Sequence, residues 1–482
     1  MAFIQRKDKW AEVSDSDKIF VPSPETFAPD AAVRRDTPMG QYPKLDAAPE
    51  VSVGIMSAER ISFSFEDDYI CRQTGETSPA GDYTVAAVSG AVEFCGGRYA
   101  ELAFEPREVQ DCMSPAGAFS LDDVTIGVGF HWQRAERQRF KGRLRFIVDG
   151  GRVVAVNIMP VEAYIYSVIS SEMSSLSSLE LLKAHAVISR SWLLAPMLNR
   201  RCERHDSMSY ITDDEVIRWY GRDAHELFDV CADDHCQRYQ GISRVQSPNV
   251  REAVRLTAGQ VLTYGGEVCD ARFSKCCGGI TERFESCWGD TVPHGYLQPV
   301  YDAPLLTALP DLSDEENARR WIFSSPDAFC NTADESVLAE VLNGYDRETT
   351  DFYRWRVSYS QAELSELVCR RSGMDFGTVT ALLPLERGAS GRIVRLKVVG
   401  TKRTVTVGKE LEIRRWLSPS HLYSSAFVVD RTPDGGFVLT GAGWGHGVGL
   451  CQVGAAVMGS RGYSYGEILA HYFPGAALTV IY

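Results

Sequence analysis

The chain has 482 residues, enough for two or three domains, and its 44% apolar and 24% charged residues are typical of a folded globular protein. A formal net charge of -14 without a basic stripe argues against binding to nucleic acid. No run of residues stays apolar for the roughly 20 positions that a bilayer span needs. We therefore expect no nucleic-acid partner and no membrane span.

The first 48 residues contain five prolines among charged residues and show neither helical nor strand periodicity. This composition predicts an extended N-terminal arm over residues 1–48. The start of the chain also lacks the apolar stretch of an export signal, so the sequence as given reads as that of a cytoplasmic protein.

Short apolar runs separated by turn residues follow the arm and predict a small β domain over residues 49–112. Beyond it, two alternating runs flank Asp149-Gly150-Gly151, which is typical of a β-hairpin. Pro160 then fits the first turn of a helix. Strands followed by helices indicate the α+β class.

Glu172 is a single acid within a run of serines, SVISSEMSSLSS, between two predicted helices. Ser177 and Glu180 have the spacing of a capping box and predict that the second helix begins at Ser177. A chain that turns between helices leaves backbone N–H groups without helical partners, and small serines would let a ligand approach them. Glu172 is therefore a candidate catalytic acid, although a lone glutamate is more often a surface charge.

The segment HELFDVCADDHC brings His225, Cys231, His235 and Cys236 within twelve residues. Thiolate sulfur and imidazole nitrogen are ligands that suit tetrahedral Zn²⁺, and two thiolates favour a structural or site-shaping ion over a catalytic one. The fourth ligand is either His235 or water. The alternative is a pair of buried cysteines beside surface histidines, because the spacing matches no standard zinc finger.

The thirteen cysteines are an odd, scattered set that includes the adjacent Cys276 and Cys277, so they do not form a disulfide framework. A reducing compartment or a metal site explains them more simply.

Two glycine-rich segments are candidate binding sites. The first, SKCCGGIT, places Ser274 and Thr281 around a turn at Gly278 and Gly279. The second, GAGWGHGVGLCQ, contains the aromatic, titratable and amide side chains Trp444, His446 and Gln452. A hairpin turn and a packed glycine corner are the corresponding structural alternatives. Between the two segments, residues 305–350 read as an acidic, mostly helical insertion with a solvated face.

Four motifs occur in order along the chain: SVISSEM with ELLKAHAVISRSWLL, then HELFDVCADDHCQRYQG, then CGGITERFESCWG, and last GWGHGVGLCQVGAAVMGSRGYSYGEILAHYFPG. Together they resemble the SpoIID/LytB family of bacterial cell-wall proteins. The resemblance covers about residues 120–300 and 350–482. It implies a SpoIID-like core of short strands and helices around a substrate groove, with its first part at 113–304 and its second at 351–482. Ser174 replaces the proline that usually follows the family's glutamate and methionine, and Cys276 and Cys451 replace small or hydroxyl residues.

The resemblance implies activity on peptidoglycan glycan strands, with Glu172 matching the glutamate of lytic transglycosylases and His225, Cys231 and Cys236 matching zinc-binding positions. One carboxylate is sufficient for such an enzyme, because the substrate's own 6-hydroxyl replaces the second acid of ordinary glycosidases. The alternatives are a wall-binding enhancer of a cell-wall amidase and a zinc-dependent hydrolase. A wall substrate implies the cell envelope, whereas the sequence as given shows no signal peptide.

Overall fold

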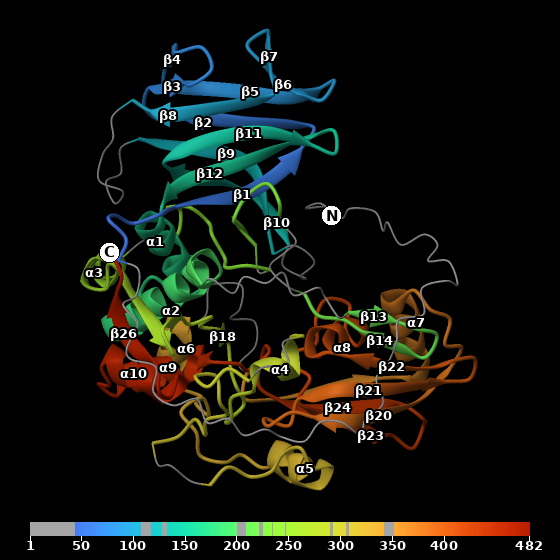
Figure 1. Cartoon of the computed structure of the whole chain (residues 1–482). Helices are drawn as coiled ribbons and strands as arrows, with labels where there is room; N and C mark the ends of the chain where they lie inside the picture. The colour runs from blue at the N-terminus through green and yellow to red at the C-terminus, as the bar shows by residue number, and fades with distance from the viewer. Residues whose placement is uncertain are drawn as a thin grey trace, which may run out of the picture.

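The computed structural model describes residues 44–107, 117–127, 133–199, 209–220, 225–233, 235–245, 247–289, 293–304, 308–341 and 351–482. Most of the arm predicted for residues 1–48 lies outside these ranges. The described residues form strands, then helices, then strands again, so the predicted α+β class is confirmed (Figure 1). None of the helices in the described part combines the length and the apolar character that crossing a bilayer requires.

Two β-sheets form the N-terminal part of the molecule, at the top of Figure 1. Rings from the two sheets meet between them: Phe63 lies 5.9 Å from Phe104 and 5.0 Å from Phe146, measured between ring centroids. The seven-stranded sheet has the order β15-β1-β12-β11-β8-β3-β4, and the six-stranded sheet has the order β10-β9-β2-β5-β6-β7. The strands are β1 (Glu50–Ala58), β2 (Arg60–Phe65), β3 (Tyr69–Cys71), β4 (Thr77–Ser78), β5 (Gly81–Val88), β6 (Ala91–Phe94), β7 (Gly97–Tyr99), β8 (Glu101–Pro106), β9 (Ala118–Ile126), β10 (Arg134–Lys141), β11 (Arg143–Asp149), β12 (Arg152–Pro160) and β15 (Val230–Cys231).

The sheets continue past residue 112, where the sequence suggested that the small β domain ends. Strand β12 pairs with β1, and β9 pairs with β2, so residues 118–160 complete both sheets. The first pairing joins strands about a hundred residues apart and the second joins strands more than fifty apart, and a local strand pattern reveals neither. The predicted hairpin is present, with Asp149 opposite Arg152 and positive φ angles of 55° and 77° at Gly150 and Gly151.

Helices α1 (Val161–Ser171) and α2 (Leu179–Leu198) follow the sheets. Pro160 is the N-cap of α1. The predicted capping box of Ser177 and Glu180 is wrong. Ser178 caps α2 by accepting the N–H of Leu181, while Ser177 donates its hydroxyl to the carbonyl of Glu340. Glu180 pairs with Lys183 and accepts the N–H of Tyr465. Tertiary contacts therefore decide which serine caps the helix.

The C-terminal half begins with helices packed beside α2 and continues into a second β region, at the lower right of Figure 1. Its larger sheet has the order β13-β14-β22-β21-β20, and a smaller one has the order β19-β24-β23. The remaining elements are β13 (Tyr210–Ile211), β14 (Glu215–Ile217), α3 (Pro248–Leu256), β16 (Gln260–Tyr264), β17 (Glu267–Val268), β18 (Phe273–Ser274), α4 (Phe284–Cys287), α5 (Glu315–Phe323), α6 (Glu335–Val341), β19 (Arg354–Tyr359), α7 (Gln361–Ser372), β20 (Val379–Arg387), β21 (Ile393–Gly400), β22 (Thr404–Gly408), α8 (Glu410–Trp416), β23 (Phe427–Arg431), β24 (Phe437–Ala442), β25 (Leu450–Cys451), α9 (Gln452–Ser460), α10 (Tyr465–Tyr472) and β26 (Ala477–Val480).

The end of the chain returns to the helical centre of the molecule. Strand β26 pairs with β16, β25 pairs with β18, and α9 and α10 both contact α2. The segment predicted to be a solvated insertion also joins this centre, because α6 packs on α9 and buries Val337, Leu338 and Val341. The two glycine-rich segments and the Glu172 junction therefore lie in one compact region.

Candidate functional site

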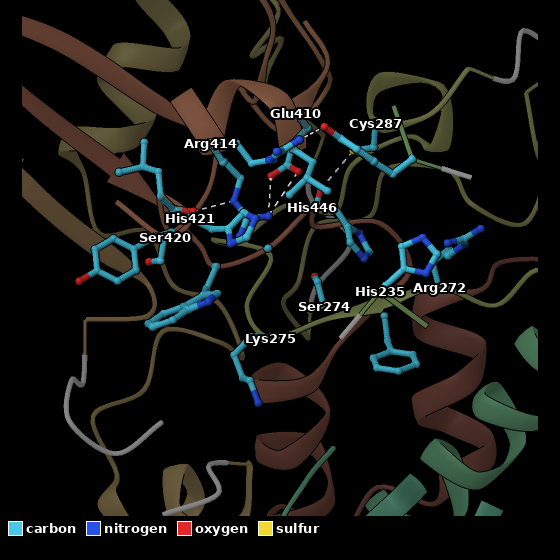
Figure 2. Close-up of a pocket in the computed structure, with 18 of the residues that line it drawn as sticks. His235, Arg272, Ser274, Lys275, Cys287, Glu410, Arg414, Ser420, His421 and His446 are labelled. Atoms are coloured by element: carbon cyan, nitrogen blue, oxygen red, sulfur yellow. Dashed lines mark hydrogen bonds and ion pairs between the residues drawn. The ribbon is translucent and has the colours of Figure 1, made fainter. Parts of the chain in front are cut away.

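A cleft of about 880 Å³ lies where the helical centre meets the C-terminal β region. Its lining includes seven of the candidate residues, which are Glu172, His235, Cys236, Ser274, Trp444, His446 and Gln452. Figure 2 shows Ser274 and His446 facing a group formed by Glu410, Arg414 and His421 across this space. The fold thus brings together most of the site predicted from separate motifs.

Glu172 is the C-cap residue of α1 and is partly buried on the cleft wall. Its Oε1 accepts the backbone N–H of Arg238 at 2.8 Å, which fixes the carboxyl group against the segment that contains Cys236. The neighbouring Ser171 accepts the N–H of Gln240 at 3.2 Å and donates its hydroxyl to the carbonyl of Ser167. Ser171 therefore holds the junction closed through hydrogen bonds. The sequence had suggested instead that the serines would let a ligand approach the backbone there.

The four predicted metal ligands converge. The ligand atoms of His225, Cys231, His235 and Cys236 lie within 4.8 Å of one another. The Cys236 sulfur is 3.4 Å from Nε2 of His225 and 3.5 Å from Nδ1 of His235. In a tetrahedral zinc site, bonds of about 2.0–2.3 Å place neighbouring ligand atoms about 3.3 to 3.8 Å apart. The two distances from the Cys236 sulfur fit a tetrahedral cation, and all four donor atoms lie close enough together to share one.

The electrostatics of the two thiols agree with this interpretation. The neighbouring Cys236 thiol, together with burial, raises the pKa of Cys231 to about 11. A cation between the two sulfurs would remove this penalty, because it stabilises both as thiolates. The cluster therefore has donor groups that a divalent cation could bind as thiolates.

Trp444 and His446 also line the cleft. The indole of Trp444 stacks on Phe352 with ring centroids 4.8 Å apart, so one of its faces is committed to packing. His446 Nδ1 accepts the backbone N–H of Val448 at 3.0 Å. Burial, together with Arg272 and Arg392, holds the pKa of His446 well below its usual value. The ring is neutral near pH 7, and its proton is on Nε2.

Gln452, at the start of α9, is held by a buried histidine of α2. Its side-chain nitrogen lies 3.2 Å from Nε2 of His185, whose Nδ1 lies 3.2 Å from the hydroxyl of Ser189. Burial, with a smaller contribution from Lys275, lowers the pKa of His185 to about 3. A neutral ring with its proton on Nδ1 satisfies both contacts, since it donates to Ser189 and accepts from Gln452.

Three of the predicted binding residues lie behind the cleft and not on its lining. Gly278 approaches the backbone of Ala442 and Gly443, and Gly279 packs beside Trp321. Thr281 is buried and its hydroxyl accepts the N–H of Val300 at 2.8 Å. Both glycines have positive φ angles, 83° and 108°, so the predicted tight turn is present. Their assignment to substrate binding stays a prediction.

The sequence reasoning missed the wall that the C-terminal β region contributes. This wall includes Glu410, Arg414, Arg415, His421, Leu422 and Tyr423. Glu410 is buried beside Arg414 with an oxygen-to-nitrogen distance of 3.4 Å, and Arg414 also donates to the carbonyl of Leu422. On the other wall Arg272 lies 4.4 Å over the ring of Trp288. No motif marks these residues, because their common position depends on how distant segments pack.

The fold and the site together define a class of protein. It is an α+β protein whose cleft carries a glutamate beside a cluster of cysteines and histidines. Residues 149–264 match the family model described as Stage II sporulation protein, SpoIID, and residues 282–449 match a domain of unknown function, DUF8618. The predicted resemblance to the SpoIID/LytB family is therefore confirmed.

Similar proteins have related names. The chain is 25% identical to Stage II sporulation protein D of Bacillus amyloliquefaciens over 327 residues, which cover 67% of this chain and 76% of that protein. It is 27% identical to an uncharacterized protein of Brachyspira hyodysenteriae over 343 residues, 70% of this chain and 72% of the other. It is 24% identical to the amidase enhancer of Bacillus subtilis over 255 residues, 50% of this chain but 34% of the enhancer.

Proposed function

We propose that this protein acts on the bacterial cell wall as a lytic transglycosylase that cleaves peptidoglycan glycan strands between N-acetylmuramic acid and N-acetylglucosamine. The SpoIID domain and the related proteins support a function on the cell wall. The observation that carries the finer proposal is Glu172, a partly buried acid on the wall of a large cleft, with its orientation fixed by the N–H of Arg238.

Glu172 acts twice in the proposed reaction. The Arg238 amide occupies Oε1, so the transferable proton is on Oε2. This proton goes to the glycosidic oxygen as the bond from that oxygen to the muramyl anomeric carbon breaks. The 6-hydroxyl of the same muramyl ring then bonds to that carbon and returns its proton to Glu172. The products are a 1,6-anhydromuramyl end and a free 4-hydroxyl, without consumption of water.

Other acids near Glu172 are poorly suited to act as a second catalytic group. Glu162 accepts two hydrogen bonds from Arg190, and Glu180 pairs with Lys183. Within the lining, Glu410 is buried beside Arg414. Asp233 is the remaining carboxylate of the lining, and it makes a matched control for Glu172.

Zn²⁺ is the cation we propose for the cluster of His225, Cys231, His235 and Cys236. A bound ion would supply positive charge that holds the two thiolates and fixes the loop around them. Arg238, whose N–H orients Glu172, follows Cys236 by two residues. The cluster would therefore position the catalytic acid through the backbone, as a site-shaping metal does.

The test is cleavage of purified glycan strands, with and without stem peptides, by the wild-type protein and the variants Glu172→Gln and Asp233→Asn, with products identified by mass spectrometry. We expect 1,6-anhydromuramic ends from the wild type and from Asp233→Asn. Glu172→Gln should be slower by at least about a thousandfold, since one group serves as acid and base. Undiminished cleavage by Glu172→Gln would exclude this residue. If the wild type instead produced reducing ends and the Asp233→Asn protein did not cleave, the protein would be a hydrolase that uses two carboxylates.

A second candidate function is enhancement of a cell-wall amidase, which the similarity to the amidase enhancer of Bacillus subtilis favours. In that case the protein would bind glycan strands without cutting them and would accelerate an amidase. The effect would survive the Glu172→Gln change. Release of stem peptides by an added amidase, measured with and without this protein, distinguishes this function from strand cleavage.

A further inference from the structure

A second cluster of soft ligands is buried behind the cleft, separate from the cluster around Cys231. The ligand atoms of Cys277, Asp302, Cys330 and Cys451 lie within 4.8 Å of one another. All four side chains are at most 2% exposed. The thiol of Cys276 also contacts those of Cys330 and Cys451. The cluster therefore contains four sulfurs and one carboxylate in an interior position.

The distances within the cluster match those around a single tetrahedral ion. The Cys277 sulfur lies 3.6 Å from the Cys330 sulfur and 3.6 Å from Oδ2 of Asp302. Zinc bonds of about 2.0–2.3 Å predict separations of about 3.3 to 3.8 Å between ligand atoms. The two distances from the Cys277 sulfur thus match tetrahedral coordination, and all four ligand atoms lie close enough together to share one ion.

The surrounding groups orient the ligands toward the centre. Oδ1 of Asp302 accepts the hydroxyl of Tyr472 at 2.6 Å, and its Oδ2 is directed to Cys277 and accepts the N–H of Cys330 at 3.1 Å. Backbone N–H groups of Cys277 and Gly454 lie 3.2 and 3.5 Å from the Cys451 sulfur, at the start of α9. Such hydrogen bonds hold metal ligands in place and favour a thiolate.

An ordinary core explains this arrangement poorly. Asp302 is fully buried. A charged carboxylate is costly in the interior unless a cation lies beside it, and thiolates share this cost. The Nε2 of His471 lies 3.6 Å from Oδ1 of Asp302, but this ring is a cation only when it is protonated. A cation at the centre of the cluster would balance the charges of the carboxylate and of the thiolates. Thiolate ligands select zinc among the common divalent ions.

We propose that Cys277, Cys330, Cys451 and Asp302 form a second metal site that binds one Zn²⁺ ion, with Cys276 as an adjacent thiol. The ligands come from four segments of the chain. The ion would join the turn after β18, the bend at residue 302, the loop before α6 and the start of α9. This explains why the segment predicted as a solvated insertion is instead anchored to the centre of the molecule.

The site lies directly behind the cleft wall. Cys276 and Trp444 exchange backbone hydrogen bonds of 3.0 and 2.8 Å, and Gln452 follows Cys451 in the chain. Ser274 and Cys451 are register partners in the pairing of β18 with β25. Loss of the ion would therefore displace Trp444 and Gln452 together, without removing any side chain from the lining.

The experiment measures metal content by mass spectrometry of the full chain purified under reducing conditions. We expect about two zinc ions per wild-type chain and about one in the Cys231→Ser/Cys236→Ser protein, which keeps only the second site. The Cys330→Ser/Cys451→Ser protein should also retain about one. Cys269→Ser is the matched control, because Cys269 is a buried thiol outside both clusters, and it should retain both ions.

A cobalt titration needs no substitution in the proposed site, so it is informative even if the Cys330→Ser/Cys451→Ser protein fails to fold. The Cys231→Ser/Cys236→Ser protein should bind one Co²⁺ with the strong visible and near-ultraviolet absorption of tetrahedral thiolate coordination. Three results would each overturn the proposal. The first is weak Co²⁺ absorption by the Cys231→Ser/Cys236→Ser protein. The second is one zinc ion per wild-type chain and none in this variant, and the third is a Cys277–Cys330 disulfide in the unreduced protein.

Discussion

His185 makes the stability of the protein sensitive to acid. Burial lowers the pKa of His185 to about 3, whereas an unfolded histidine titrates near 6.5. The unfolded chain therefore binds a proton in a pH range where the folded chain does not. Stability is unaffected above about pH 6.5 and decreases as the pH falls below it.

The size of the effect follows from the two pKa values. Each pH unit below about 6.5 costs about 1.4 kcal/mol for this one group, so lowering the pH to about 5 should cost about 2 kcal/mol. A protonated ring would also direct an N–H at the side-chain nitrogen of Gln452, which lies 3.2 Å away. The same protonation should therefore reorient a residue of the cleft.

The assay is urea unfolding at about pH 7.5 and about pH 5, followed by tryptophan fluorescence, for wild type and His185→Gln. The variant should lose about 2 kcal/mol less than wild type over this interval. His294→Gln is the control for removal of a partly exposed imidazole. Equal losses in wild type and His185→Gln would refute the reasoning, because the pH dependence would then come from other groups.

Three further predictions concern the junction and the cleft. Glu162→Gln should destabilise the protein by about 3 kcal/mol, because it leaves the buried Arg190 without its charge partner. Thermal unfolding measures this loss, with Glu252→Gln, at an exposed ion pair, as the control. His446→Ala should slow strand cleavage about tenfold and keep the thermal unfolding transition, since it removes one neutral hydrogen-bond donor from the cleft. Loss of the unfolding transition in this variant would show that His446 has a structural role. Chelation should lower cleavage and speed proteolysis near residues 231–238, whereas a hydrolase using metal-bound water would lose activity with that segment still protected.

Local chemistry was sufficient to predict the hairpin at Gly150 and Gly151 and the position of Glu172 between two helices. It also predicted that His225, Cys231, His235 and Cys236 converge. Each depends on residues within about a dozen positions, so turn preferences, helix periodicity and ligand type largely determine the outcome. The capping residue of α2 was the exception. Ser177 and Ser178 are equivalent by local preference, and the carbonyl of Glu340 from a distant segment engages Ser177.

Tertiary structure decided everything that depends on separate segments meeting. The pairing of β1 with β12 extended the N-terminal sheets beyond residue 112, and the packing of α6 on α9 buried a segment that the sequence marked only as acidic. Cys277, Asp302, Cys330 and Cys451 are up to 174 residues apart, and no spacing rule joins them. The sequence by itself determined which short segments hold an acid, a tight turn or a set of Cys and His donors close together. Strand register and core packing determined which of them share one site, because these interactions join residues that no local pattern relates.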